Sequence, residues 1–358
     1  MIRPWIFEFF NPWHGGAPEP FDAGRCAREY QWYLELWASA EPLGFEGIFF
    51  SEHHFFPGRF SPSPNLLIAA TAMRTRTLRL GVMGQVLPLY EPWRVAEECA
   101  MLDQLSGGRL EIGFSSGIGP REYQQVGIAA EEVKPRFAEA MEIIRLALSQ
   151  ERFTHHGRFW KFTDLAISPR ALQQPLPPRW ITGLSMETAA QAASAGLRFC
   201  TGFMETAQAA PIFAHYREVA RAAGQPASAD QLGLRRQVII ADDDAEARAI
   251  GAEATARMRR MMGGARVASI APDAPTPAPT PTPTPTPAPA HRGPVIGEEE
   301  TIAGSPDSVA EQLIAQCRAI GAGHLLAYAP GTISAEQMQR SQQLWRSVIP
   351  RLRAAQVD

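Results

Sequence analysis

The sequence predicts an α/β protein, a (β/α)8 barrel of the TIM type with insertions. Short β-rich runs alternate with segments of helical periodicity along the chain, and eight of each can be traced. Several strand candidates are apolar without alternation, which is typical of strands covered on both faces. Because right-handed crossovers place every helix outside the sheet, eight such units favour a closed parallel barrel. A doubly wound open sheet is the structural alternative.

The candidate strands are distributed over the whole chain. They are residues 5–10, 45–51, 78–84, 109–115, 179–183, 197–202, 233–240 and 324–328. The helical segments between them carry one-sided apolar stripes. The third helix also has marked ends, because Pro92 lies in its first turn and Gly107 follows its last residue.

Two segments interrupt this alternation. Residues 151–178 form an excursion between the fourth helix and the fifth strand, and it could form a small hairpin. Residues 271–290 are almost entirely Pro, Thr and Ala, so they lack apolar side chains for packing and are expected to be an extended insert. Such an insert is either a lid or a linker, and its repetitive composition favours a linker. Helical patterns flank it, so we expect a single domain over residues 1–358.

Composition and charge exclude several classes of protein. The 34 basic and 37 acidic residues give a net charge of -3 without a basic block, so we expect no nucleic-acid partner. The four cysteines lack metal-ligand spacing and are expected to be reduced thiols. No apolar stretch approaches the ~20 residues of a membrane span, and the amino-terminal run lacks a signal-peptide cleavage site. We therefore expect a cytoplasmic protein without a membrane contact.

In this fold the active site lies at the carboxyl ends of the strands. Glu52, His53 and His54 follow the second strand. Adjacent strand residues point to opposite faces, so only one imidazole faces the barrel interior, and the strands that follow supply no further ligands. We therefore expect no metal site. The two histidines are either structural groups or include a general base that titrates near neutral pH.

Two further strand ends are candidates for binding. Ser185 and Thr188 begin the fifth helix, where hydroxyls and free amides suit a phosphate, although simple helix capping is the alternative. Glycine-containing turns at 81–84 and 113–119 allow the backbone to approach a flat ring closely. The sequence has no GxGxxG or phosphate-loop motif, which leaves a Rossmann domain unsupported.

Three strings together resemble the bacterial luciferase-like flavin monooxygenases, especially the branch of the luciferase alpha subunit. They are GFEGIFFSEHHF at 44–55, LRLGVMGQVLPLYEPWRVAEECAMLDQLSGGRLEIGFSSG at 78–117 and GSPDSVAEQL at 304–313. The likeness covers nearly the whole chain apart from the Pro-Thr insert.

The resemblance implies a role for each matching position. His53 matches the catalytic base beside the flavin, and Glu52 matches a carboxylate near the flavin ring. Met83 and Gly84 match a cofactor-contacting strand end that carries a non-proline cis peptide in relatives. Further cofactor contacts are expected from the fourth strand end and the fifth helix start, and they comprise Ser116, Gly117, Ser185 and Thr188. The last two would hold the flavin phosphate.

The chain departs from the luciferase alpha subunit at two places. Ser115 and Ser116 stand where that subunit has a reactive Cys followed by an Arg, and Leu184 stands where it has a Glu. Loss of the arginine removes a charge-assisted contact to the phosphate.

The resemblance implies a flavin-dependent monooxygenase. Reduced FMN from a separate flavin reductase and molecular oxygen would oxidise a small hydrophobic organic substrate through a flavin peroxide. The resemblance also implies a homodimer. An apolar pocket is expected from Phe49, Phe55, Phe56 and Tyr328. The alternatives are a deazaflavin-dependent hydride-transfer oxidoreductase and a flavin-binding protein without turnover.

Overall fold

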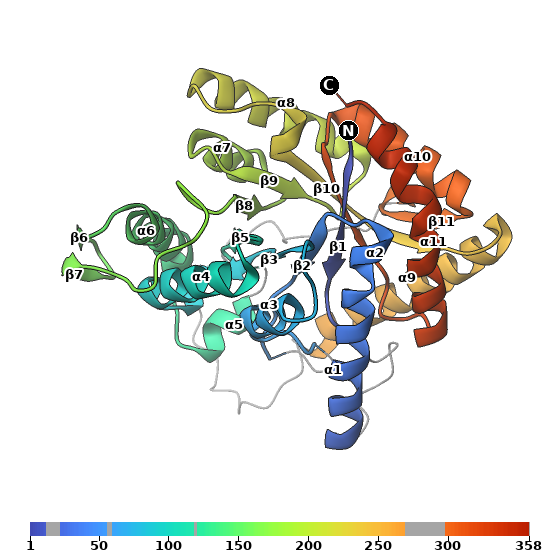
Figure 1. The fold of residues 1–358 in the computed structure, drawn as a ribbon, viewed down its shortest axis with the longest axis horizontal. Coiled ribbons are helices and arrows are strands. Elements are labelled where there is room, and N and C mark those ends of the chain that lie inside the picture. The colour runs from blue at the N-terminus through green and yellow to red at the C-terminus, as the bar shows by residue number, and fades with distance from the viewer. Residues whose placement is uncertain (12–21, 56–58, 118–119, 269–297, 358) are drawn as a thin grey trace, which may run out of the picture.

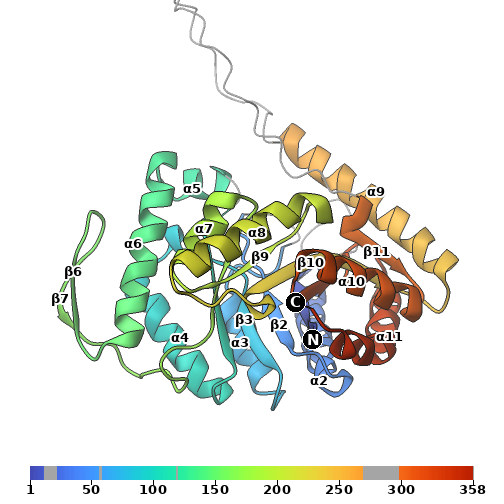
Figure 2. The same cartoon turned by 90° about the horizontal axis from the view of Figure 1, so that it is seen from above.

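The computed structural model describes residues 1–11, 22–55, 59–117, 120–268 and 298–357. Parallel strands lie at the centre of the molecule and helices surround them (Figures 1 and 2). The barrel strands are β1 (Arg3–Glu8), β2 (Gly47–Phe50), β3 (Arg79–Val82), β5 (Leu110–Ser115), β8 (Arg179–Thr182), β9 (Arg198–Thr201), β10 (Leu232–Ile240) and β12 (His324–Tyr328).

The barrel is closed. Parallel pairing runs from β1 through β2, β3, β5, β8, β9, β10 and β12 and back to β1. The closing register joins Arg3–Ile6 of β1 to His324–Ala327 of β12. The predicted (β/α)8 barrel is thus confirmed, and the open doubly wound sheet is wrong.

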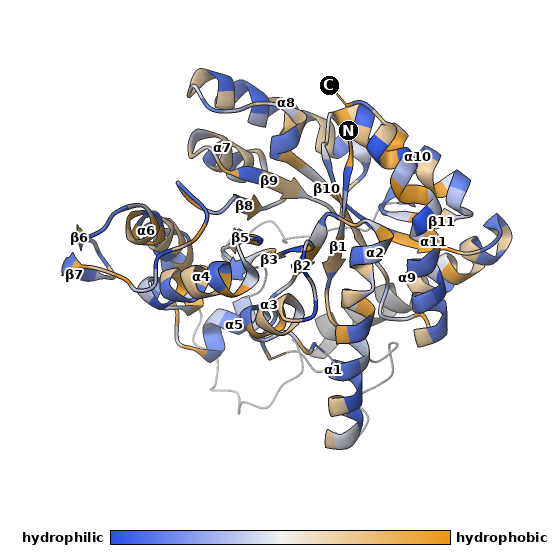
Figure 3. Cartoon of the chain, viewed as in Figure 1, coloured by the Kyte–Doolittle hydropathy of each residue, from blue (hydrophilic) through white to orange (hydrophobic). Residues whose placement is uncertain are grey.

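The helices cover the outside of this barrel, and hydrophobic and hydrophilic stretches alternate along outer helices such as α8, α10 and α11 (Figure 3). The helices are α1 (Ala23–Ala38), α2 (Ala40–Leu43), α3 (Pro64–Ala72), α4 (Pro92–Ser106), α5 (Pro120–Gln125), α6 (Ala130–Ser149), α7 (Met186–Ser194), α8 (Thr206–Ala222), α9 (Asp244–Ala268), α10 (Pro306–Ile320) and α11 (Ala335–Ala354). Pro92 begins α4 and Gly107 ends it in the left-handed conformation, as the sequence predicts.

Within the described ranges, four strands lie outside the barrel ring. β6 (Phe153–His156) and β7 (Lys161–Leu165) pair antiparallel within the excursion and project beside α6, away from the barrel strands (Figures 1 and 2). β4 (Gln85–Val86) pairs with the end of β5. β11 (Thr301–Gly304) pairs with residues 237–240 of β10, beyond the part of β10 that pairs with β9. The predicted insert at 271–290 lies outside the described residues.

The core has two parts. Aliphatic and aromatic side chains fill the shell between the strands and the helices. The barrel interior is a separate, largely aromatic cluster of Trp5, Phe7, Phe49, Met83, Trp180, Cys200, Leu326 and Tyr328, with Phe9 packed against it. Dense packing of this interior leaves the carboxyl end of the barrel as the place where strand ends can bind a ligand.

Candidate active site

Glu52 and His54 form a buried acid–imidazole pair directly after β2. His54 Nε2 donates to Glu52 Oε1 at 2.9 Å, and the His54 amide donates to Oε1 of Glu122 from α5 at 2.9 Å. Burial raises the pKa of Glu52, which outweighs the lowering effects of His54, the Val86 amide and the Tyr90 hydroxyl. The hydrogen bond to Glu52 raises the pKa of His54. His54 therefore lies next to two carboxylates, and it stays protonated to a higher pH than an ordinary histidine.

His53 points to a different neighbourhood from His54. Its ring stacks on Phe9 with centroids 6.1 Å apart and planes inclined by 21°. Burial lowers the pKa of His53 to about 3, assisted by the charges of Arg59, His54 and Arg235. The ring is thus neutral at neutral pH, which differs from the expectation of a base that titrates near neutrality. Its lone pair can still accept a hydrogen bond or a proton.

The expected ring-binding wall lies at the ends of β3 and β5. The peptide between Met83 and Gly84 is cis, as the resemblance implies. Gly84 packs so closely on β5 that a Cβ atom there would lie 2.6 Å from the Phe114 carbonyl. Gly117 has a φ of +86°, and a Cβ there would lie 1.9 Å from the Tyr123 hydroxyl. Both glycines therefore allow close approaches that a side chain would block.

The serine pair at the end of β5 is ordered locally. The Ser115 hydroxyl accepts from the Gly117 amide at 2.9 Å, and Ser116 is partly buried beside it. Met83 is buried in the barrel interior, where its side chain belongs to the aromatic cluster. Ser116 and Gly117 therefore lie at the same barrel end as Glu52, as expected of neighbouring strand ends.

Ser185 is the N-cap of α7. Its hydroxyl accepts from the Thr188 amide at 3.2 Å and lies 3.0 Å from the Thr188 hydroxyl. The remaining amides of the first turn have no partner within a helix, and the helix dipole places partial positive charge there. The neighbouring Leu184 is 45% exposed. The capping role and a phosphate-binding role are compatible, because the cap uses only one of the free amides.

The structure separates the residues expected to line an apolar pocket. Phe49 is fully buried among Trp5 and Trp180 below the strand ends. Phe55 is 49% exposed, and Phe56 lies outside the described residues. Tyr328 is buried and packs edge-on against Phe9 with centroids 5.1 Å apart. The aromatic wall beside His53 is thus formed by Phe9, Tyr328 and Phe203, the last stacked on Phe9 at 6.1 Å.

Sequence reasoning missed two cations and two acids at this end of the barrel. Arg59 follows the β2 loop, Arg235 lies within β10, Glu122 lies in α5 and Glu300 precedes β11. The signal available for Arg235 is the pair Arg235-Arg236 inside an otherwise apolar strand. No comparable local signal marks Arg59, which comes close to His53 only through folding of the loop after β2.

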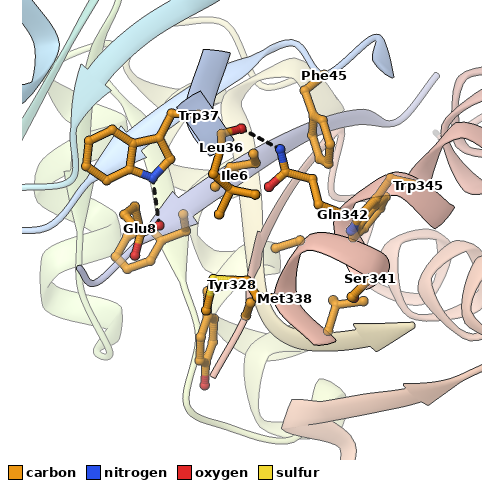
Figure 4. A pocket seen from close by; sticks show the side chains of 14 residues that line it. Ile6, Glu8, Leu36, Trp37, Phe45, Tyr328, Met338, Ser341, Gln342 and Trp345 are labelled. Carbon is orange, nitrogen blue, oxygen red and sulfur yellow. Dashed lines mark hydrogen bonds between the residues drawn. The ribbon is translucent and has the colours of Figure 1, made fainter. Parts of the chain in front are cut away.

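Two cavities lie away from the strand ends of β2 to β5. One, of about 40 Å³, lies between β1, α1 and α11, where Trp37 donates to Glu8 at 2.9 Å (Figure 4). That volume holds only a few water molecules. The other, of about 280 Å³, lies at the amino end of the barrel. Its charges are paired there, since Glu111 binds Arg79 at 2.6 Å and Arg198 at 3.3 Å.

Neither a metal centre nor a membrane helix emerges within the described ranges. No three His, Cys, Asp or Glu side chains of these residues gather as a group that could hold a metal ion. No helix of the described part of the chain is long and apolar enough to cross a membrane.

A closed parallel barrel with titratable side chains gathered at the carboxyl ends of its strands has the arrangement of a (β/α)8-barrel enzyme. Comparison with known proteins specifies the class further. The model of the luciferase-like monooxygenase family matches residues 7–324. The chain therefore belongs to the luciferase-like monooxygenase family.

Individual relatives agree with this assignment. The oxygenase component of flavin-dependent trigonelline monooxygenase from Acinetobacter baylyi is 36% identical over 154 residues, which is 42% of each chain. The monooxygenase RslO1 from Streptomyces bottropensis superposes with a TM-score of 0.81 at 25% identity, covering 98% of this chain and 99% of that one.

A third relative carries a bound cofactor. It is the oxygenating constituent of 3,6-diketocamphane monooxygenase from Pseudomonas putida, in complex with FMN. It has a TM-score of 0.74 at 21% identity and covers 100% of this chain and 99% of that one, which shows a shared fold. Among the curated relatives, the matched stretches span 44, 53 and 42% of the first three, so the chain spans about half their length.

Proposed function

We propose that this protein is the oxygenase of a two-component system. It uses reduced FMN from a separate flavin reductase, together with molecular oxygen, to oxidise a small hydrophobic organic substrate. The observation that carries the proposal is a group of buried polar atoms at the strand ends, none of which has a partner of good hydrogen-bond geometry among the described residues: Glu52 Oε2, Gln85 Oε1 and Tyr123 Oη.

These three atoms fit a flat heterocycle that offers both donors and acceptors. Glu52 is within electrostatic reach of Tyr123, and Tyr90 is within reach of both Glu52 and Gln85, so the group forms one neighbourhood. Buried polar groups without partners cost free energy, and a ligand that satisfies them recovers it. Gly84 and Gly117 supply the close backbone approach at the same wall.

The start of α7 fits a phosphate. Ser185 and Thr188 place two hydroxyls 3.0 Å apart at the positive end of a nine-residue helix. Glu187 in this turn pairs with Lys134 of α6 at 3.0 Å, so that lysine already has a carboxylate partner. Hydroxyls and amides would therefore hold the phosphate without a dedicated arginine, consistent with Ser116 replacing the luciferase arginine.

Within this assignment the protein supplies shielding and proton management, while bound reduced FMN supplies the reaction with oxygen. His53 is neutral at neutral pH and presents a lone pair beside Phe9, so it can accept a proton from a reacting group. The aromatic wall of Phe9, Phe203 and Tyr328 would exclude water from the reacting atoms. His53 would be the catalytic base and Glu52 a supporting carboxylate.

The names of two relatives support the flavin reductase and the FMN cofactor in this proposal. One relative is described as an oxygenase component, a term that implies a separate reductase, and another is described as bound to FMN. A homodimer, which the resemblance implies, stays a prediction.

The first prediction tests the handling of flavin and oxygen. Protein loaded anaerobically with photoreduced FMN is mixed with oxygenated buffer, and the return of the oxidised flavin absorbance is followed. The wild type is expected to slow reoxidation at least about tenfold relative to free FMN, because the pocket excludes water and proton donors. His53→Ala should lose most of this delay while it still binds FMN.

The control is Arg94→Gln, since Arg94 is exposed on α4, where it pairs with Glu98 and lies over the Trp93 ring. It should behave as the wild type does. Reoxidation at the rate of free FMN by a wild type that demonstrably binds flavin would contradict the proposal. Anaerobic hydride transfer with a deazaflavin, or tight flavin retention without oxygen consumption in the presence of substrates, would point instead to the two alternative functions.

A further inference from the structure

Arg235 is a buried cation that points into the barrel. It alternates along β10 with Arg236, whose side chain lies outside the barrel against Gln316 of α10. Arg235 is only 7% exposed, and its guanidinium carbon lies 3.5 Å from the Phe203 ring centroid and 5.6 Å from that of Phe9. Gly202 makes room for it, since a Cβ at Gly202 would lie 2.8 Å from Arg235 Nε.

Arg59 approaches the same aromatic group from the loop after β2. Its guanidinium carbon lies 4.9 Å from the Phe9 ring centroid. Burial lowers the pKa of Arg59 to about 10, still high enough for the side chain to be charged at neutral pH. Phe9 thus has a guanidinium group from each of two distant chain segments near its ring, and it stacks on His53 as well.

Both arginines keep buried hydrogen-bond donors without a partner among the described residues: Arg59 Nη1 and Arg235 Nε. Ring contacts compensate part of the desolvation of a guanidinium but do not satisfy its N–H groups. By contrast, Arg79 and Arg198 at the amino end of the barrel have a carboxylate partner, because both bind Glu111. The donors at the carboxyl end are therefore available to an acceptor that enters from outside.

Glu300 acts electrostatically on Arg235 and Glu8 on Arg59, but both acids make their hydrogen bonds to other groups. Glu300 binds Arg236 at 3.2 Å and accepts from the Phe203 amide at 2.9 Å. Glu8 accepts from the Phe10 amide at 2.7 Å and from Trp37 at 2.9 Å, and burial raises the pKa of this carboxyl. Arg59 and Arg235 thus face the barrel interior near His53, and neither forms an ion pair with a carboxylate of the described residues.

We propose that Arg59 and Arg235 bind a carboxylate group carried by the organic substrate, whose apolar body then lies against Phe9 and Phe203 next to His53. The inference rests on the proposed function and refines its substrate class from a hydrophobic compound to a hydrophobic acid. A guanidinium fork matches a planar carboxylate, and the aromatic rings match an apolar body. The flavin phosphate is the other anion that could enter, and its expected place is the start of α7.

The second prediction tests this class with simple probes. The protein with oxidised FMN is titrated by calorimetry with benzoate and hexanoate. Benzamide and hexanamide serve as neutral counterparts of the same shape. The wild type is expected to bind at least one acid about tenfold or more tightly than its amide. Arg235→Gln and Arg59→Gln should each remove most of this preference and leave the affinity for FMN unchanged.

Arg235→Lys retains the charge without the fork and should show an intermediate preference, and Arg94→Gln should match the wild type. Melting temperatures identify any variant that fails to fold. Arg59→Gln tests the inference independently of Arg235→Gln, because Arg59 lies in a different segment of the chain. No preference for any acid over its amide in the wild type would overturn the inference. So would an unchanged preference in both folded glutamine variants, or a loss confined to FMN affinity. The titration needs neither reduced flavin nor oxygen, so its failure is distinguishable from failure of the proposed function.

Discussion

His53 and His54 are neighbours in the chain, yet their pKa values move in opposite directions. Burial and the positive charges of Arg59 and Arg235 lower the pKa of His53, whereas the Glu52 carboxylate raises that of His54. The difference arises from their surroundings, because the His53 ring packs on Phe9 whereas the His54 ring contacts the Glu52 carboxylate. His54 thus stays protonated to a higher pH than an ordinary histidine, while the proposed base His53 is neutral at neutral pH.

The third prediction concerns this pair and uses the pH dependence of stability. The folded pKa of His54 lies above its ordinary value of 6.5. Its contribution to the free energy of unfolding is therefore fully present below about pH 6 and lost as pH rises through the folded pKa. Urea unfolding of the wild type and of His54→Gln over a pH series should show a difference that shrinks with increasing pH. A difference that is constant with pH would contradict the assignment.

The sequence could predict which residues follow β2 but not how they ionise. The position of Glu52, His53 and His54 at a strand end follows from the alternation of strands and helices. The pKa of His53 depends on Arg235, which is 182 positions away in the chain, and on the burial that folding produces. Such long-range electrostatics have no local signature in a single sequence.

At the scale of elements, β10 connects the fold to the site. Its first part pairs with β9 and its last four residues pair with β11, so it is supported along its whole length. Arg236 on its outer side forms an ion pair with Glu300, and both side chains are fully buried. Arg236 also donates to Gln316 at 2.7 Å, which ties β10 to α10.

The fourth prediction is that this ion pair stabilises β10 in its native position. Arg236→Met leaves the Glu300 carboxylate buried without its cation, and loss of one partner of a buried pair costs roughly 3–5 kcal/mol. Chemical denaturation measures this loss. The double variant Arg236→Met with Glu300→Gln should recover part of it, since the uncompensated charge is gone. Arg340→Met, which breaks an exposed pair with Asp242, is the control. A loss no larger than that of the control would contradict the prediction.

Element prediction succeeded where the pattern was long and failed where it was short. Each barrel strand overlaps a predicted range, and the helical pattern expected after the Pro-Thr insert corresponds to α10. β11 was missed because it has only four residues, directly after an acidic run. β4 was missed because it has only two residues, which directly follow the third predicted strand at 78–84.

At the scale of the whole molecule, barrel strands come from both before and after the Pro-Thr insert in the sequence. α9 ends before that segment, and β11, α10 and β12 follow it, so closure through β12 and β1 uses residues from beyond it. The single domain expected over residues 1–358, with the insert inside it, is therefore a proposal that a deletion experiment can test.

The fifth prediction replaces residues 271–290 with a Gly-Ser sequence of equal length. Equal length keeps the entropy of loop closure nearly constant, and the Pro, Thr and Ala side chains offer little apolar surface for packing. Melting temperature and substrate oxidation should both stay close to wild type, as expected of a linker. A fall in turnover of about tenfold at unchanged melting temperature would show instead that the segment acts as a lid.

The alternation of Arg235 and Arg236 also bears on how such an enzyme can change its preference. Arg235 faces the aromatic rings of the proposed binding site and Arg236 forms the ion pair with Glu300 outside the barrel, so separate side chains carry the two tasks. A substitution at position 235 can alter which charge the pocket accepts without disturbing the ion pair behind it. Adaptation to neutral compounds, in nature or by directed evolution, would therefore begin on the inner face of β10.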